Sequence, residues 1–319
     1  MRLAIIALVS SATPTLAEEI RLGLPLVCDL VNGPCYIQQF TDHDAGPDAT
    51  DFMCGSLSYD GHKGTDFALP SLAMQAEGVE VVASADGVVK GVRDAMPDIM
   101  QGDLGAPDVS NVECGNGVVI DHGDGWETQY CHMALGSITV ASGQQVTAGT
   151  VLGKVGLSGQ TQFPHVHLSV RKDGEVIDPF DMGGAATCGD VAVSMFIDTP
   201  PTPAGGLVSA GFAPDIPEYA AVKAGTAGAE AIAPTDNMVA WGFVFGTRVG
   251  DVLHTVITGP EGEVFDGETA LDRQQAMAFR ASGKRAPDGG WPTGDYTATI
   301  EMIRDGAVLD TQTTTVTVR

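Results

Sequence analysis

The chain has 319 residues, a length sufficient for two domains with separate buried cores. Its 16 Lys and Arg residues against 41 Asp and Glu residues give a formal net charge of −25 at pH 7. This charge disfavours attraction to nucleic acid and to anionic lipid, so we expect no nucleic-acid partner.

The first 17 residues have the pattern of a secretory signal peptide. Arg2 precedes the apolar run Leu3–Val9, and small residues end at Ala17, ahead of Glu18 and Glu19. The apolar run is too short to cross a bilayer, and no other segment approaches the required length. We therefore expect residues 1–17 to be removed and the mature protein to be periplasmic or extracellular, without an integral membrane segment.

All six cysteines lie within the first 188 residues, and their even number in an exported chain predicts disulfide bonds. Zinc–thiolate ligation is the rival interpretation, but the spacings contain no C-x-x-C pair. The Gly123-Asp124-Gly125 turn predicts a hairpin between Gly117–Asp121 and Trp126–Cys131, which brings Cys114 near Cys131. The remaining pairs are Cys28 with Cys35, around the turn Asn32-Gly33-Pro34, and, by elimination, Cys54 with Cys188.

Residues 18–55 show little periodicity and predict an irregular, cysteine-containing cap. Residues 56–190 contain short strand patterns and glycine turns, which predict an all-β domain. The stretch between Val92 and Val112 is too long for a hairpin turn. It forms either a wall of a substrate groove or an insert without a role.

Three short motifs in this β domain contain histidines or a carboxylate. His165 and His167 fall on one face of an expected strand, because strand side chains alternate between faces. This pair alone is equally compatible with a solvated strand face. His62 and Asp66 form a second cluster, and imidazole with carboxylate is a combination that binds zinc. His132 completes the set, near the end of another expected strand.

The order His62-x-x-x-Asp66, Tyr130-x-His132, His165-x-His167 resembles the lysostaphin/LytM-type zinc metalloendopeptidases. The glycine-containing segments 82–89, 116–123 and 149–159 agree with that family, and the resemblance covers about residues 56–180. It implies a duplicated-hybrid-motif-like β fold, a barrel-like catalytic sheet and one zinc ion per chain. One departure is Phe163, where a glycine is commoner before the proline; we expect its ring to narrow the groove and alter specificity.

The resemblance also implies the role of each site residue. His62, Asp66 and His167 become the metal ligands, which leaves a fourth position open as in catalytic zinc sites. His132 and His165 become the proton-handling catalytic groups, without a decision on which is the base. Tyr59 is a candidate for oxyanion support.

The rest of the chain predicts a linker and an accessory domain. Residues 191–235 are rich in Pro, Ala and Gly and predict a linker. Residues 236–319 show strand patterns at 239–245, 253–257, 296–303 and 313–318, typical of a small immunoglobulin-like β-sandwich. We expect this domain to bind a wall polymer or protein partner, or to cover the enzyme.

The leading hypothesis is a zinc-dependent endopeptidase that hydrolyses peptide bonds of peptidoglycan stems or crosslinks through a metal-activated water. One alternative is a catalytically silent family member that binds the wall or activates another wall hydrolase. A second alternative is a binding or adhesion protein whose function lies in the C-terminal sandwich.

Overall fold

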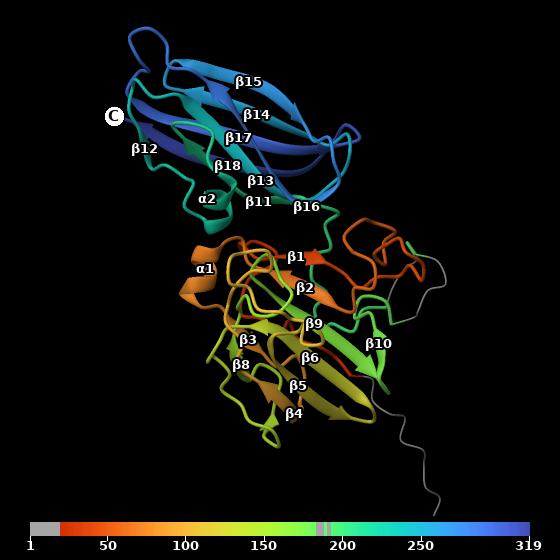
Figure 1. Cartoon of the computed structure of the whole chain (residues 1–319). Coiled ribbons are helices and arrows are strands. Elements are labelled where there is room, and N and C mark those ends of the chain that lie inside the picture. Colours follow the sequence, from red (N-terminus) through yellow and green to blue (C-terminus); the bar gives the residue numbers. More distant parts are fainter. Residues whose placement is uncertain (1–19, 183–187, 190–192) are drawn as a thin grey trace, which may run out of the picture.

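The structure is a computed structural model that describes residues 20–182, 188–189 and 193–319. It consists of two β-rich lobes joined by a short connection (Figure 1). The predicted signal peptide, residues 1–17, lies outside the described residues. None of the helices in the described part is long and apolar enough to cross a membrane.

The N-terminal lobe is built on an eight-stranded antiparallel sheet. Its strands follow the order β1-β2-β9-β6-β5-β4-β7, with β10 paired to β9, and a two-stranded sheet of β3 and β8 lies beside it. The buried faces of these strands share one hydrophobic core. In chain order the elements are β1 (Tyr36–Gln39), β2 (Thr65–Ala68), α1 (Leu72–Glu77), β3 (Glu80–Val82), β4 (Gly87–Arg93), β5 (Asn116–Gly123), β6 (Trp126–Met133), β7 (Gln145–Val146), β8 (Val151–Lys154), β9 (His165–Lys172) and β10 (Glu175–Ile177).

The predicted hairpin between β5 and β6 is present. Asp124 and Gly125 both have positive φ, 48° and 80°, as expected for a tight turn between twisted antiparallel strands. The cysteines pair as Cys28–Cys35, Cys54–Cys188 and Cys114–Cys131, the three pairings considered from the sequence.

The segment predicted as an irregular cap, residues 18–55, also contributes to the main sheet. Its strand β1 pairs with β2, and Gln39 lies opposite Asp66. The four residues of β1 are all buried, two of them glutamines, so the alternation of apolar and polar residues that marks a half-buried strand is missing. The cap is therefore regular where it joins the sheet.

The C-terminal lobe is a sandwich of two sheets, with strand orders β11-β13-β16 and β12-β18-β17-β14-β15. The all-β class and the C-terminal sandwich predicted from the sequence are confirmed. The elements are β11 (Gly206–Ala213), α2 (Tyr219–Ala224), β12 (Ala231–Ile232), β13 (Met238–Thr247), β14 (Val252–Gly259), β15 (Gly262–Ala270), β16 (Gln275–Lys284), β17 (Gly294–Arg304) and β18 (Ala307–Val318).

The sandwich begins upstream of the predicted boundary at residue 236. Strand β11 lies within the segment predicted as a linker, yet it pairs with β13 along its length. Its small residues conceal a strand pattern, and one of them is required by packing. A side chain at Gly211 would collide with the indole ring of Trp241.

The two lobes are joined through strand β13, all ten residues of which are buried. Ala240 and Val244 pack in the sandwich core, whereas Trp241 and Phe245 belong to the core cluster of the N-terminal lobe. The ring of Phe245 lies 4.6 Å from that of Tyr36 on β1. Because one strand supplies side chains to both cores, the position of the C-terminal lobe is fixed by apolar packing.

Candidate active site

Strand β9 lies at the centre of the site, between β2 and β6. His167 is the register partner of Asp66 on β2 and of Cys131 on β6, so His132 follows at the adjacent position. Val166 and Leu168 point into the core, and His165 and His167 therefore share the opposite face. The structure thus brings together the histidines and the carboxylate that the three motifs supplied.

His62, Asp66 and His167 form one compact group. His62 Nε2 lies 3.2 Å from Asp66 Oδ1 and 3.1 Å from His167 Nδ1, and His167 Nδ1 lies 2.8 Å from Asp66 Oδ1. One potential ligand atom from each residue falls within 4.8 Å of the others. Two imidazole nitrogens and a carboxylate oxygen form a donor set suited to a catalytic zinc ion.

The hydrogen bonds behind this group direct both imidazole lone pairs towards it. His62 Nδ1 donates to the Phe40 carbonyl at 2.7 Å, so its Nε2 is unprotonated in the neutral ring. His167 Nε2 donates to Ser169 Oγ at 2.9 Å, and Ser169 Oγ donates in turn to the Lys63 carbonyl at 2.8 Å. Such contacts fix the tautomer and ring orientation of metal-binding histidines, so the residues present fit a zinc ion.

Asp66 is suited to serve as an anionic ligand. Burial disfavours its charged form, but His62 and His165 counter this by their charges. Where these imidazoles are protonated, their charges and the hydrogen bonds that His165 and His167 then donate hold the pKa of Asp66 well below its usual 3.8. The loop before Asp66 approaches β9 closely, and a side chain at Gly64 would collide with the Leu168 carbonyl and the His167 ring.

His132 and His165 lie beside the group of potential ligands, with their ring centres 4.6 Å apart. His132 has a φ of +61°, an uncommon conformation for a non-glycine residue, and its Nδ1 donates to the Ser158 carbonyl at 2.8 Å. Burial, followed by the charges of His165 and His167, holds the pKa of His132 well below 6.5. The ring is therefore neutral at pH 7, with its lone pair at Nε2.

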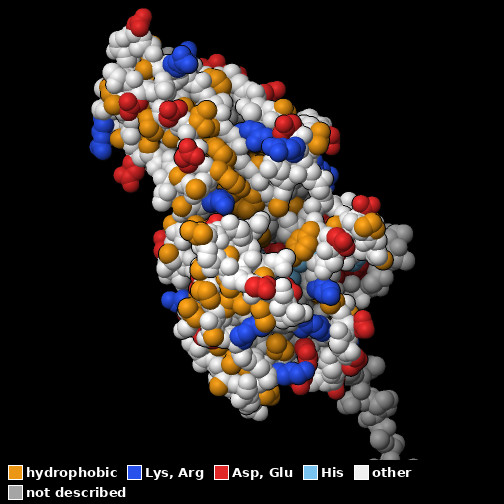
Figure 2. All heavy atoms as spheres, in the orientation of Figure 1, with side chains coloured by type: hydrophobic (Ala, Val, Ile, Leu, Met, Phe, Trp, Pro, Cys, Tyr) orange, Lys and Arg blue, Asp and Glu red, His pale blue; other side chains and the backbone are white. Residues whose placement is uncertain are grey.

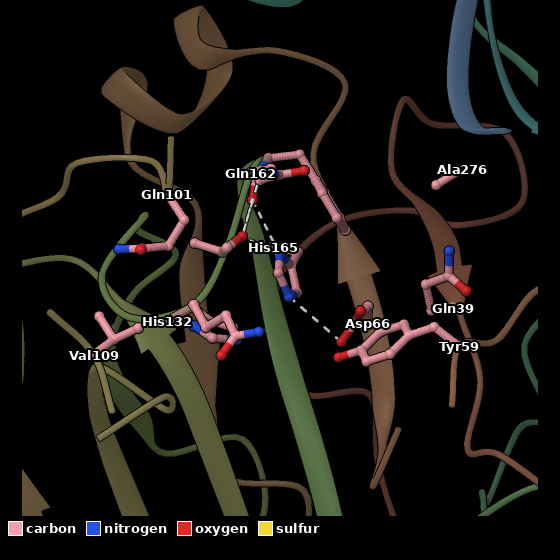
Figure 3. Close-up of a pocket in the computed structure, with 12 residues that line it drawn as sticks. Gln39, Tyr59, Asp66, Gln101, Val109, His132, Gln162, His165 and Ala276 are labelled. Carbon is pink, nitrogen blue, oxygen red and sulfur yellow. Dashed lines mark hydrogen bonds and ion pairs between the residues drawn. The ribbon is translucent and has the colours of Figure 1, made fainter. Parts of the chain in front are cut away.

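His165 is held in a different way. Its Nδ1 lies 3.0 Å from the Phe163 carbonyl and 3.1 Å from Thr161 Oγ1, while its Nε2 lies 3.4 Å from Asp66 Oδ1. The ring of Phe163 stacks on the imidazole at 4.3 Å. Figure 3 shows His132, His165 and Asp66 gathered around one cavity.

Tyr59 lies at the rim of the same cavity. Its side chain is half exposed, and its ring stacks on that of His62 at 4.4 Å. Partial burial and the charge of Asp66 raise the pKa of Tyr59 above its usual 10. The hydroxyl therefore remains a hydrogen-bond donor at neutral pH.

Cavities lie on both sides of the site. One, of about 440 Å³, is lined by Asp66, His132 and His165, and another, of about 500 Å³, by His62 and His167. Tyr59, His132 and Gln160 line both cavities, so an extended ligand can pass across the site.

The long stretch between β4 and β5 forms a wall of the first cavity through Gln101 and Val109. It is anchored by Asp94, whose carboxylate accepts hydrogen bonds from the backbone N–H groups of Gly136 and Ile138. Of the two interpretations drawn from the sequence, the groove wall agrees with the structure.

Two of the cavity residues that the sequence did not indicate come from segments far from the motifs. Gln39 comes from the cap segment and Ala276 from the C-terminal lobe, and neither lies in a motif. Ser169 was also missed, although its spacing of two from His167 places it on the same strand face.

Comparison with known proteins supports the resemblance drawn from the motifs. Residues 60–179 match the family model described as Peptidase family M23. The chain is 35% identical over 118 residues to the DD-carboxypeptidase/endopeptidase Mpg of Neisseria meningitidis, with 37% of this chain and 22% of that protein covered. It is 33% identical over 117 residues to the peptidoglycan DD-endopeptidase ShyA of Vibrio cholerae, with the same coverage. The alignments thus span less than a quarter of these relatives.

One solved structure that superposes on the chain is the catalytic domain of the prophage-encoded M23 protein EnpA from Enterococcus faecalis. It is 24% identical, with a TM-score of 0.33, and the superposition covers 51% of this chain and 96% of that structure. The resemblance to the lysostaphin/LytM-type peptidases is confirmed for residues 60–179 by the family match.

Proposed function

We propose that the chain is a zinc-dependent endopeptidase that hydrolyses peptide bonds of peptidoglycan in the periplasm or outside the cell. The observation that carries this proposal is the convergence of His62 Nε2, Asp66 Oδ1 and His167 Nδ1 beside His132 and His165. The substrate class comes from the named relatives of residues 60–179. The three disulfides agree with an oxidising compartment.

Zinc held by His62, Asp66 and His167 would supply Lewis acidity, which lowers the pKa of water and polarises a carbonyl group. The protein's own groups would handle protons and the developing charge. His132 offers its Nε2 lone pair to the proton of the attacking water, since its Nδ1 donates to Ser158. His165 is placed to pass a proton to the leaving amine, and the Tyr59 hydroxyl to donate to the oxyanion.

The test separates metal binding from catalysis. Alanine at His62, Asp66 or His167 is expected to lower both bound zinc and hydrolysis. Alanine at His132 or His165 is expected to retain zinc near wild-type stoichiometry and to slow hydrolysis by roughly 10²–10⁴, the usual contribution of a positioned acid or base. The measurements are metal content by atomic emission and release of label from peptidoglycan.

A matched control is His254→Ala. This histidine lies on β14 of the C-terminal lobe, between Asp266 and Glu301, and its loss is expected to change neither zinc content nor rate. If His165→Ala lost zinc while His167→Ala kept it, the ligand assignment would be reversed. If all five site variants hydrolysed peptidoglycan as fast as the wild type, the proposed endopeptidase function would be refuted.

A further inference from the structure

The cavity beside His132 and His165 continues between the two lobes. A neighbouring cavity of about 490 Å³ shares Gln101, Gln162, Phe163 and Ala276 with it and extends to α2. We name these two joined cavities the interdomain groove. Figure 2 shows the molecule hollowed between its lobes at this place.

The C-terminal lobe is a fixed wall of the interdomain groove. Ala276 lines both cavities, and its carbonyl accepts a hydrogen bond from Gln38 Nε2 of β1 at 2.7 Å. On α2, the ring of Tyr219 stacks on Phe279 at 5.6 Å with an interplanar angle of 6°. The groove therefore keeps its shape without a ligand, a condition that favours binding.

Gln39 presents an unsatisfied amide to the groove. The residue is 7% exposed, and its side-chain oxygen Oε1 is buried without a hydrogen-bond partner among the described residues. A buried amide oxygen without a partner is costly, and most such groups in native structures have one. Gln39 lines the cavity next to Asp66 (Figure 3), so a turn of its amide towards the cavity would let Oε1 accept a hydrogen bond from a ligand N–H.

Lys223 presents an unpaired positive charge at the far end of the groove. Among the described residues that line the two cavities it is the one Lys or Arg. Its ammonium lies 5.2 Å from the centre of the Tyr219 ring and makes no ion pair with a described residue. Asp103 lines the same cavity but is exposed on its loop. An unpaired lysine can form a charge-assisted hydrogen bond with a ligand carboxylate.

We propose that the interdomain groove binds the part of an acidic peptide substrate that continues beyond the scissile bond. Gln39 accepts a hydrogen bond from a backbone N–H of the peptide, and Lys223 binds a carboxylate further along it. The bound peptide would run from His132 and His165 towards α2, because the two cavities join and extend in that direction. This inference rests on the peptidase function proposed above, for which it assigns the C-terminal lobe a role in substrate specificity.

The test measures binding by the zinc-loaded full chain carrying His132→Ala, so that bound peptide is not consumed. The probes are two fluorescein-labelled peptidoglycan stem tetrapeptides, one with free carboxylates and one with all carboxylates amidated. Lys223→Ala and Lys223→Gln should raise the dissociation constant of the carboxylate peptide about tenfold and leave that of the amidated peptide unchanged, because a charge-assisted hydrogen bond is lost. Gln39→Ala should weaken both peptides about equally, by roughly fivefold.

Lys284→Ala is the matched control, since this lysine lies on β16 of the same lobe outside the groove, and both constants should stay at their starting values. The proposal is overturned if the Lys223 variants keep the starting ratio between the dissociation constants of the two peptides. It is also overturned if the starting chain binds neither peptide. The wild-type chain could hydrolyse peptidoglycan while the Gln39 and Lys223 variants bind both peptides as tightly as the starting chain. That result would refute the role of the interdomain groove and leave the peptidase function standing. Conversely, the variants could show the expected changes in dissociation constant although the wild-type chain does not hydrolyse peptidoglycan. That result would refute the peptidase function and support peptide binding by the groove.

Discussion

Ser169 connects a potential metal ligand to the backbone. It accepts a hydrogen bond from His167 Nε2 and donates one to the carbonyl of Lys63, which lies between His62 and Asp66 in the sequence. The serine thereby fixes which nitrogen of His167 has a free lone pair. The loss of such a hydrogen-bond partner behind a metal-binding histidine typically weakens metal binding by about 10–100-fold.

Replacing Ser169 with alanine should therefore lower zinc affinity by about 10–100-fold while leaving the fold intact. The loss arises because His167 is free to rotate or to change tautomer. Competition against a chelator measures the affinity, and Ser110→Ala, at an exposed serine that bonds Asp108, provides the control. Equal zinc affinity in the two variants would show that Ser169 has no such role.

His43 gives the stability of the N-terminal lobe a pH dependence. Its Nε2 lies 2.7 Å from Asp178 Oδ2 in the segment after β10. This hydrogen bond raises the pKa of His43 above 6.5; burial opposes the shift, and the charges of Asp178, Asp181 and Asp51 add to it. A raised folded-state pKa gives stability that is fully present below about pH 6.5 and lost as the pH rises through the folded-state pKa.

We therefore expect His43→Asn to destabilise the protein more at about pH 5.5 than at about pH 9. Urea unfolding of the wild type and the variant at both pH values gives the difference in their free energies of unfolding. The contributions of the other titrating groups cancel in this difference. A difference that grew with pH would contradict the assigned sign.

At the scale of residues, the sequence predicted the five residues that the structure brings together at the site, but it did not indicate the two residues to which we assign ligand binding in the interdomain groove. His62, Asp66, His132, His165 and His167 were found because their spacing follows from strand geometry and family resemblance. Gln39 and Lys223 have no such spacing, since each comes from a segment brought to the groove by tertiary packing. Their signal is physical, an unsatisfied amide and an unpaired charge, and is visible only in the folded chain.

Among the elements, β13 and β11 show opposite limits of pattern reading. The sequence of β13 alternates large and small residues that are nearly all apolar, which predicted a strand but not the two surfaces that cover it. The sequence of β11 predicts a linker, because its glycines and alanines carry little hydrophobic pattern. A strand that fits beneath the Trp241 indole needs such small residues, so its packing is what concealed it.

The Cys114–Cys131 disulfide joins the long cavity loop to β6, one residue before His132. His132 N donates to the Cys114 carbonyl at 2.8 Å, so the bridge also supports the unusual backbone of this histidine. Serine at both cysteines should lower the free energy of unfolding by about 3 kcal/mol, from the entropy of the open loop. The Cys28–Cys35 pair spans 7 residues rather than 17, and its removal should cost about 2 kcal/mol.

Urea unfolding of both double variants, together with hydrolysis assays, checks the bridge. The Cys114/Cys131 variant should lose activity as well as stability, whereas the Cys28/Cys35 variant should lose stability alone. Free thiols at Cys114 and Cys131 in a non-reducing peptide map of the wild type would exclude this pairing.

For the whole molecule, the shared core makes the C-terminal lobe part of one folded unit with the N-terminal lobe. One hydrophobic cluster contains Phe67 and Leu168 of the N-terminal sheet together with Trp241 and Phe245 of β13. A truncation that removed the C-terminal lobe would expose the apolar surface around Tyr36 and confuse loss of function with misfolding. A single substitution at the interface is the better probe of how the lobes cooperate.

Phe245→Ala should uncouple the lobes, because it removes the ring that packs on Tyr36 across the interface. A buried phenylalanine reduced to alanine costs about 3–5 kcal/mol, and here the loss falls on the contact between two cores. Calorimetry should show one unfolding transition for the wild type and two for this variant. Ile257→Ala, inside the sandwich core alone, should lower the melting temperature and keep a single transition.

Since the interdomain groove needs both lobes in place, Phe245→Ala should also raise the KM for long peptides more than it lowers kcat. A variant that unfolds in one step with an unchanged KM would mean that the lobes are coupled through other contacts.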